Sequence, residues 1–191
     1  MVRAYSFRPL SADTWDDFER LFGPRGASGG CWCMLYRVPR AAWEAGKGDG
    51  NRAAMQALVD SGAPPGILAY DGEEAVGWCS IAPRAVFAGL GRTRVMKPLD
   101  DEPAWLVTCF FIRASHRRQG LSVALLEAAC EHVRAQGGRV IEGFPTEPKG
   151  GHMAAAFAWT GLAATFRAAG FTEVERRSAT RPAMRRRLDV G

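Results

Sequence analysis

Residues 112–126 combine the residue types that bind anions. Arg117 and Arg118 supply positive charge, Gly120 supplies backbone without a side chain, and residues 121–126 begin a helical pattern. The first N–H groups of a helix have no backbone partners and lie at the positive end of the helix dipole. A side chain at Gly120 would hold a phosphate away from that backbone. The segment therefore predicts a phosphate-binding helix start.

Two hydrophobic segments flank this helix in the sequence. Residues 105–112 are almost uniformly apolar, which predicts a central strand buried on both faces. Helical periodicity runs from Gln119 to Gln136, Gly137 ends it, and residues 139–142 read as a following strand. Strand, helix and strand in this order predict a βαβ unit with parallel strands.

The rest of the chain predicts further strands and helices around this unit. We expect a short strand at residues 3–8, a helix that Gly23 and Pro24 end, and a helix at residues 51–61. Asp71-Gly72 predicts a hairpin between residues 66–70 and 75–81. We also expect an irregular, partly helical segment at 25–50, a loop at 84–100 and a last helix at 162–169. Two closing strands should follow from 171 onward, and the second of them should be a solvated basic edge.

Length and composition indicate one globular domain. The chain has 191 residues, of which 47% are hydrophobic and 24% charged, and a formal net charge of +5. Its five cysteines are an odd number spread through apolar sequence, so we expect them to be reduced. The first ten residues lack the apolar core of a signal peptide, and no stretch is long and apolar enough to cross a membrane, so a cytoplasmic protein is expected.

The spacing of the glycine turn distinguishes among phosphate-binding motifs. It has neither the Gly-Lys-Ser/Thr ending of a Walker loop nor the Gly-x-Gly-x-x-Gly dinucleotide pattern. It resembles the Arg/Gln-x-x-Gly-x-Gly/Ala motif of the GNAT superfamily of N-acetyltransferases, with Arg117 first, Gly120 fourth and Ser122 sixth. Ser122 departs from the pattern, although it is small enough to keep the site. The order of elements over residues 66–190 is also similar to that family.

The resemblance implies an α/β fold with one GNAT-type domain over residues 1–191. Residues 25–65 would be an irregular, partly helical acceptor-side segment, and residues 105–143 the acetyl-CoA-binding βαβ core of a mixed, mostly antiparallel sheet flanked by helices. No metal is expected. The alternative for the turn is a basic helix cap that contacts only water. By similarity, the residues that bind acetyl-CoA would be Phe110, Phe111, Ile112, Arg117, Arg118, Gln119, Gly120, Leu121 and Ser122.

Acetyl transfer to an amine requires a neutral amine, and an alkylammonium has a pKa of about 10.4 in water, so a general base is expected. Glu142 is the first candidate because it ends the strand that the resemblance places beside the cleft. The alternative to a catalytic role is that the Glu142 carboxylate contacts only solvent or pairs with an arginine. Glu102 and His152 are weaker candidates.

The departing thiolate requires a proton, which many GNAT enzymes take from a tyrosine four residues before the glycine that ends the last helix. That position holds Phe166, which has no proton to donate, so Tyr36 or Tyr70 could serve, or the thiolate could leave to water. Cys109 could be a nucleophile, but a buried structural thiol is favoured. The pair Cys31 and Cys33 is a weak zinc signal without a second pair.

These observations predict an N-acetyltransferase in which an amine of a small molecule or peptide attacks acetyl-CoA directly. The alternative is a protein of the same fold that binds or sequesters a ligand without turnover, which Phe166 motivates. Nucleic-acid binding by the arginines of residues 176–187 is disfavoured because no aromatic residues are interleaved with them. A homodimer is left open, and no membrane partner is expected.

Overall fold

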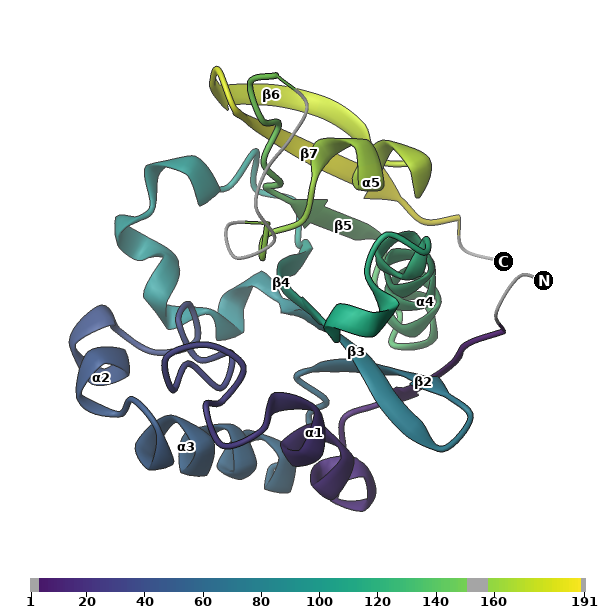
Figure 1. Ribbon diagram of the computed structural model, residues 1–191. Coiled ribbons are helices and arrows are strands. Elements are labelled where there is room, and N and C mark those ends of the chain that lie inside the picture. Colours follow the sequence, from purple (N-terminus) through teal and green to yellow (C-terminus); the bar gives the residue numbers. More distant parts are fainter. Residues whose placement is uncertain (1–3, 151–157, 190–191) are drawn as a thin grey trace.

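One mixed sheet forms the centre of the computed structural model, which describes residues 4–150 and 158–189 (Figure 1). Its strand order is β1-β2-β3-β4-β5-β7-β6, and β4 and β5 are parallel whereas the other neighbours are antiparallel. The strands are β1 (Ser6–Pro9), β2 (Gly66–Asp71), β3 (Glu74–Pro83), β4 (Trp105–Ile112), β5 (Val140–Gly143), β6 (Thr172–Ser178) and β7 (Arg181–Arg187).

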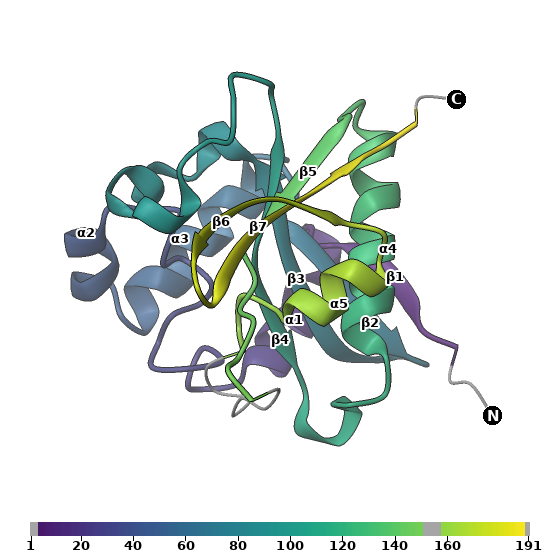
Figure 2. The ribbon, with the colours of Figure 1, turned by 90° about the horizontal axis from the view of Figure 1, so that it is seen from above.

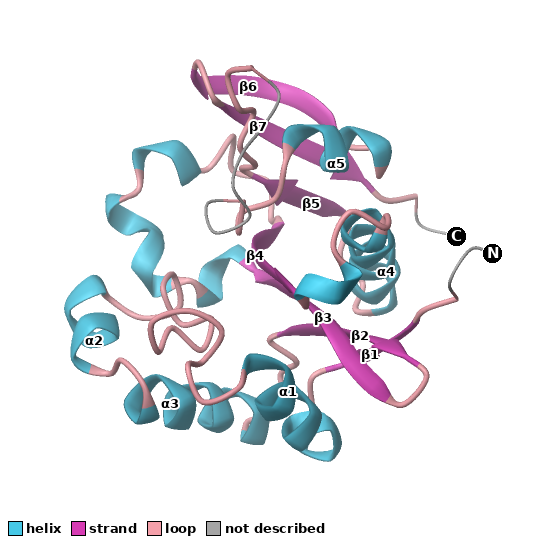
Figure 3. Cartoon of the chain, in the orientation of Figure 1, coloured by secondary structure: helices cyan, strands magenta, loops and turns pink. Residues whose placement is uncertain are grey.

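Helices cover both faces of this sheet (Figure 2). They are α1 (Trp15–Phe22), α2 (Arg40–Ala45), α3 (Asp49–Asp60), α4 (Leu121–Ala135) and α5 (Ala163–Ala168). A long connection without helix or strand joins α1 to α2 (Figure 3). In the described part of the chain, every helix is too short or too polar to span a bilayer.

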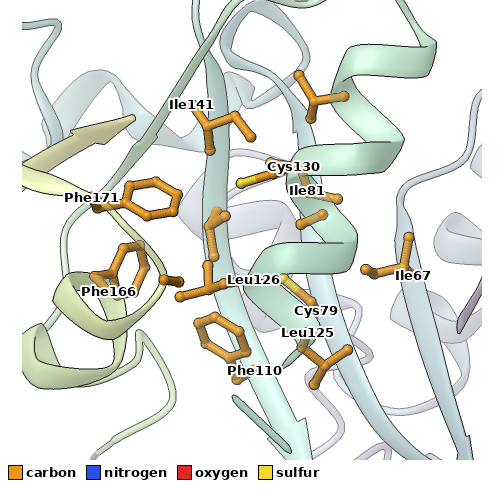
Figure 4. Close-up of a cluster of buried hydrophobic side chains, with 14 of the residues drawn as sticks. Ile67, Cys79, Ile81, Phe110, Leu125, Leu126, Cys130, Ile141, Phe166 and Phe171 are labelled. Atoms are coloured by element: carbon orange, nitrogen blue, oxygen red, sulfur yellow. The ribbon is translucent and has the colours of Figure 1, made fainter. Parts of the chain in front are cut away.

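The buried side chains form three clusters, and the two larger ones lie on opposite faces of the sheet because side chains alternate along the strands. Ile67 and Ala69 of β2 face α4, in a cluster that also contains Phe110 and Phe166 (Figure 4). Leu68 and Tyr70 face the other way, where they pack with aromatic residues of α1 and with Trp78. Burial on both faces explains why the middle strands read as continuous apolar runs.

The contact between β4 and β5 is short. Trp105, Leu106 and Val107 pair with residues 141–143, whereas residues 108–112 of β4 continue along β3 alone. The two parallel strands therefore separate toward the carboxyl end of β4. That separation leaves main-chain groups of β4 without a neighbouring strand on the β5 side.

The structure confirms the predicted α/β class, the mostly antiparallel sheet and the parallel β4-α4-β5 unit. Two expectations were wrong. The predicted loop at 84–100 contains three short 3-10 helices, Arg84–Val86, Ala88–Arg92 and Arg94–Met96. The basic terminal strand β7 lies between β5 and β6 rather than at the edge, because its arginines are neutralised by acidic residues from distant segments.

Candidate functional site

The start of α4 has the conformation of an open anion site. Gly120 caps the helix in the left-handed region, with φ of 80°, and a side chain there would point into open space. Within the described residues, the backbone N–H groups of residues 118–122 form no hydrogen bond. Donors without a partner at the positive end of a helix are suited to an anionic ligand.

Polar contacts within the turn hold this start in place. The Arg117 Nε donates to the carbonyl oxygen of Ile112 at 2.9 Å, and Gln119 Nε2 donates to that of Ser115 at 2.7 Å. Arg118 adopts a left-handed φ of 58°, which is strained for a residue with a side chain. All three side chains are exposed, so their charge and amide groups face solvent beside the helix start.

The buried side chain of His116 holds the same turn in place. His116 is 6% exposed, its Nε2 lies 3.1 Å from Asp71 Oδ2, and its Nδ1 lies 2.9 Å from Ser115 Oγ. This contact joins the turn to the end of β2. This contact could not be predicted from the sequence, because residues 71 and 116 meet only through the pairing of distant strands.

Leu121 and Ser122 differ in their roles at the helix start. Leu121 is buried, with 1% exposed, and its side chain packs close to Gly77 of β3. Ser122 is partly exposed. The leucine thus fixes the helix against the sheet, while the serine stays accessible beside the unpaired N–H groups.

The end of β4 presents main-chain groups toward β5. The Arg113 N–H bonds to Val76 of β3, so the alternation of an antiparallel ladder directs Phe110 and Ile112 to the opposite side. The N–H of Phe110 is engaged there by the carbonyl oxygen of Trp159 at 2.6 Å. Phe111 faces the second core, where its ring lies 5.3 Å from that of Phe22.

Glu142 lies at the centre of a cluster of ion pairs. It is 1% exposed, Oε2 accepts from Arg84 Nη2 at 2.7 Å, and Oε1 accepts from Arg185. Both oxygen atoms are thus occupied by guanidinium groups, which matches the arginine-paired alternative. The role of Glu142 as general base stays a prediction.

Of the two weaker base candidates, Glu102 belongs to the same ion-pair cluster, because Arg185 contacts both Glu142 and Glu102. Glu102 pairs with Arg187 at 2.7 Å, and this contact lowers its pKa. His152 lies outside the described residues.

Phe166 is fully buried between two aromatic rings. Its ring lies 6.2 Å from Phe110 and 5.0 Å from Phe171, both in edge-on contact. Of the two alternative proton donors, Tyr70 donates its hydroxyl to Asp17 at 2.8 Å, and burial followed by this contact raises its pKa. Tyr36 lies 5.7 Å from the ring of Trp159, and burial raises its pKa to about 12.

The five cysteines are free thiols, of which Cys31 and Cys109 are partly exposed and the others buried. Among the described residues, no group of three or more histidine, cysteine or acidic side chains could hold a metal ion. Cys109 is not isolated in apolar surroundings, because its thiol contacts Cys33. This hydrogen bond and burial raise the pKa of Cys109 well above its ordinary value.

The described residues form an α/β domain in which a helix start with unpaired N–H groups lies beside two parallel strands that diverge. A family model for the acetyltransferase (GNAT) family matches residues 32–158, and the chain therefore belongs to the GNAT family of acetyltransferases. A comparison with curated proteins found no match.

Solved structures share this fold at low sequence identity. The PaiA N-acetyltransferase from Thermoplasma acidophilum in complex with coenzyme A is 10% identical, with a TM-score of 0.53 over 97% of this chain and 99% of that one. YncA from Salmonella typhimurium with acetyl-CoA is 13% identical, with a TM-score of 0.53 over 97% and 95%. A mosquito arylalkylamine N-acetyltransferase-like protein (5b) is 10% identical, with a TM-score of 0.57 over 97% of this chain and 100% of that one.

Proposed function

We propose that this acetyltransferase transfers the acetyl group of acetyl-CoA to an amine, which attacks the thioester directly. The observation that carries this proposal is the row of unpaired N–H groups at the start of α4, with Gly120 left-handed and open space beside it. The family match supports acetyl transfer as the chemistry.

The described residues fit the pyrophosphate of acetyl-CoA. Residues 118–122 supply backbone donors, and the exposed Arg117 and Arg118 supply positive charge. On the β5 side, Trp159 already accepts from the Phe110 N–H and Arg117 donates to the Ile112 carbonyl oxygen, so the Ile112 N–H would be the main-chain donor offered to the extended arm in the gap between the strands. Acetyl-CoA, when bound, supplies the activated acetyl group.

The contribution of the protein is then mainly to position the amine and to exclude water around it. Tyr36 is better placed than Tyr70 to donate a proton near the gap, because Tyr36 packs on Trp159, whose carbonyl oxygen contacts Phe110. With a pKa of about 12, its hydroxyl is protonated at neutral pH and can donate a hydrogen bond. Tyr70 is already engaged with Asp17.

The proposed chemical class of the acceptor rests on the comparison with solved structures of the same fold. An arylalkylamine N-acetyltransferase-like protein and the NatC complex bound to a Gag peptide both share this fold, at 10% identity each. They support a small-molecule or peptide amine as the acceptor.

The test is turnover with a panel of primary amines and peptide amino termini. We expect thiol release that depends on both acetyl-CoA and an amine, together with an acetylated product found by mass spectrometry. Binding of acetyl-CoA by calorimetry without product from any amine would favour the alternative of a silent binding protein. Absence of binding would contradict the site itself.

A further inference from the structure

The turn between β4 and α4 (residues 114–120) contains two left-handed residues. Arg118 has a φ of 58° and Gly120 a φ of 80°, and Arg118 carries a side chain that this conformation disfavours. The 3-10 helix Ala114–His116 that begins the turn ends before both residues. Within the described residues, the backbone N–H groups of residues 118–122 form no hydrogen bond. Contacts of side chains must therefore hold the turn in this conformation.

One polar side-chain contact links the turn to another part of the sheet. Arg117 and Gln119 donate to carbonyl oxygens within residues 112–115, so these two contacts move with the turn itself. His116 differs, because its Nε2 lies 3.1 Å from Oδ2 of Asp71. Among the described residues, this is the only hydrogen bond from a side chain of the turn to a strand other than β4. The contact therefore links the turn to the end of β2.

Asp71 is a fixed point for this contact. It is the last residue of β2, and it pairs with Glu74 across the hairpin to β3. Strand β2 lies between β1 and β3, so it is hydrogen-bonded on both sides. Gly72, with a left-handed φ of 60°, closes the hairpin directly after Asp71. The position of the carboxylate is therefore set by the sheet and not by the turn that it contacts.

The surroundings of His116 favour a strong and directed hydrogen bond. The side chain is 6% exposed, so water competes little for its ring nitrogens. An ionised carboxylate only accepts hydrogen bonds, so Nε2 donates to Asp71, and Nδ1 can accept from the hydroxyl of Ser115 at 2.9 Å. The centre of the Tyr5 ring lies 6.3 Å from that of the imidazole, in edge-on contact. Both ring nitrogens thus have partners, and the orientation of the imidazole is fixed.

We propose that His116 is a positioning residue for the diphosphate of acetyl-CoA, an inference that rests on the proposed function. Its bond to Asp71 holds the turn so that the N–H groups of residues 118–122 are already oriented when the ligand arrives. Donors that are oriented in advance bind an anion without the cost of ordering them. Without this bond the turn can leave its left-handed conformation, and the donors lose their fixed direction. The buried His116 acts through the turn and does not touch the ligand.

The first experiment compares two ligands that differ in the diphosphate. S-acetylpantetheine keeps the thioester and the extended arm of acetyl-CoA but lacks its diphosphate and adenosine. Dissociation constants for both ligands are measured by calorimetry on the same protein samples. In His116→Phe, which keeps a ring but has no ring nitrogen, acetyl-CoA should bind about tenfold more weakly, the loss typical of one hydrogen bond to a charged group. S-acetylpantetheine should bind as before, and an equal loss for both ligands, or no loss, would overturn the inference.

Further variants test whether the contact itself is the cause. His116→Gln retains an N–H donor and should recover part of the affinity for acetyl-CoA. Asp71→Ala should weaken acetyl-CoA binding as His116→Phe does, and the double variant should lose no more than either alone. Losses that simply add would mean that the two side chains act independently, and this result would contradict the proposal. His132→Phe is the matched control and should bind both ligands as the unmodified protein does, because this half-buried imidazole packs edge-on against Trp105 near the other end of α4.

The comparison of ligands also separates this inference from a loss of stability. A fraction of unfolded protein weakens the apparent binding of both ligands by the same factor, so the ratio of the two dissociation constants is unaffected by it. If His116→Phe does not fold, His116→Gln and Asp71→Ala provide the same ratio. Absence of acetyl-CoA binding by the unmodified protein would contradict the proposed function and this inference together, whereas an unchanged ratio in the variants would contradict this inference alone.

Discussion

Gly120 meets two requirements that no other residue type meets together. Its φ of 80° is left-handed, and its missing side chain leaves the N–H groups of the helix start open to a ligand. Open space around it shows that the protein itself does not require a small residue there. The requirement therefore lies in the backbone conformation and in the proposed ligand.

Replacement of Gly120 by Asp should abolish acetyl-CoA binding, because a carboxylate would occupy the place of the pyrophosphate. The left-handed conformation should cost about 1–2 kcal/mol of folding stability. Gly137→Asp is the matched control, since Gly137 has φ of 77°, open space around it, and a position after the other end of α4. Calorimetry should show lost binding in Gly120→Asp alone, and equal affinities in both variants would refute the site.

Glu142 allows a second test at the scale of one residue. A Glu142→Gln protein leaves Arg84 and Arg185 without their shared carboxylate, so unfolding free energy should fall by about 3 kcal/mol in urea titrations. If Glu142 is also the base, the acetylation rate should fall more at neutral than at alkaline pH. A loss of stability with an unchanged pH profile would leave it a structural residue.

The residues of the helix start could be predicted, but their surroundings could not. A local pattern of glycine, arginine and helix periodicity is sufficient to indicate residues 117–122. The contacts of Glu142 with Arg84, of His116 with Asp71 and of Cys33 with Cys109 join segments far apart in the chain. Such contacts depend on strand order, which hydrophobic periodicity does not specify.

At the scale of secondary-structure elements, β5 packs closely against α5. A side chain on Gly143 would meet the ring of Phe166 well inside van der Waals contact. Gly161 approaches the same ring, so two glycines flank one aromatic residue. This packing holds α5 against the end of β5, next to the point where β4 and β5 separate.

A Gly143→Ala protein should therefore lose about 1–3 kcal/mol of stability through overpacking. Adding Phe166→Leu should recover part of that loss, because the smaller side chain makes room. Gly91→Ala is the control, since a side chain there meets open space. The measurement is urea-induced unfolding of the three variants and the unmodified chain, and equal midpoints for Gly143→Ala and the unmodified chain would contradict this packing.

The sequence predicted most elements within a few residues, because amphipathic periodicity and glycine stops are local signals. It failed for residues 84–100, since 3-10 turns have no such period. It also misplaced β7, because the arginines that suggest solvent exposure are paired with Asp100, Glu102 and Glu142. Charged residues in a strand indicate an edge strand only when they contact solvent rather than oppositely charged side chains of the protein.

At the scale of the whole molecule, ion pairs attach the segment after β3 to β7. Arg185 contacts both Asp100 and Glu142, and Arg187 contacts Glu102. The hydrogen bond from Arg185 lowers the pKa of Asp100 to about 2, below the value of about 3.9 for an unfolded chain. The stabilisation is complete above the unfolded value and is lost as pH falls through the folded one.

An Asp100→Asn protein should accordingly have a lower Tm than the unmodified chain at pH 7. The difference should shrink as pH falls from about 4 to about 2, where Asp100 becomes protonated in the folded state. Asp101→Asn is the neighbouring control, because Asp101 is exposed and forms no ion pair with the described residues. A difference in Tm that stays constant over this range would exclude the contact with Arg185 as its cause.

The outer strand β6 has a further consequence for association. Glu173, Glu175 and Arg176 are exposed along it, and the opposite outer strand β1 is only four residues long and ends at Pro9. A second molecule that added a strand beside β6 would have to displace water from these charged side chains. Beside β1 it would find few free backbone donors. Extension of the sheet into a fibre through either outer strand is therefore disfavoured. Two copies that associate would have to meet through helices or connecting segments.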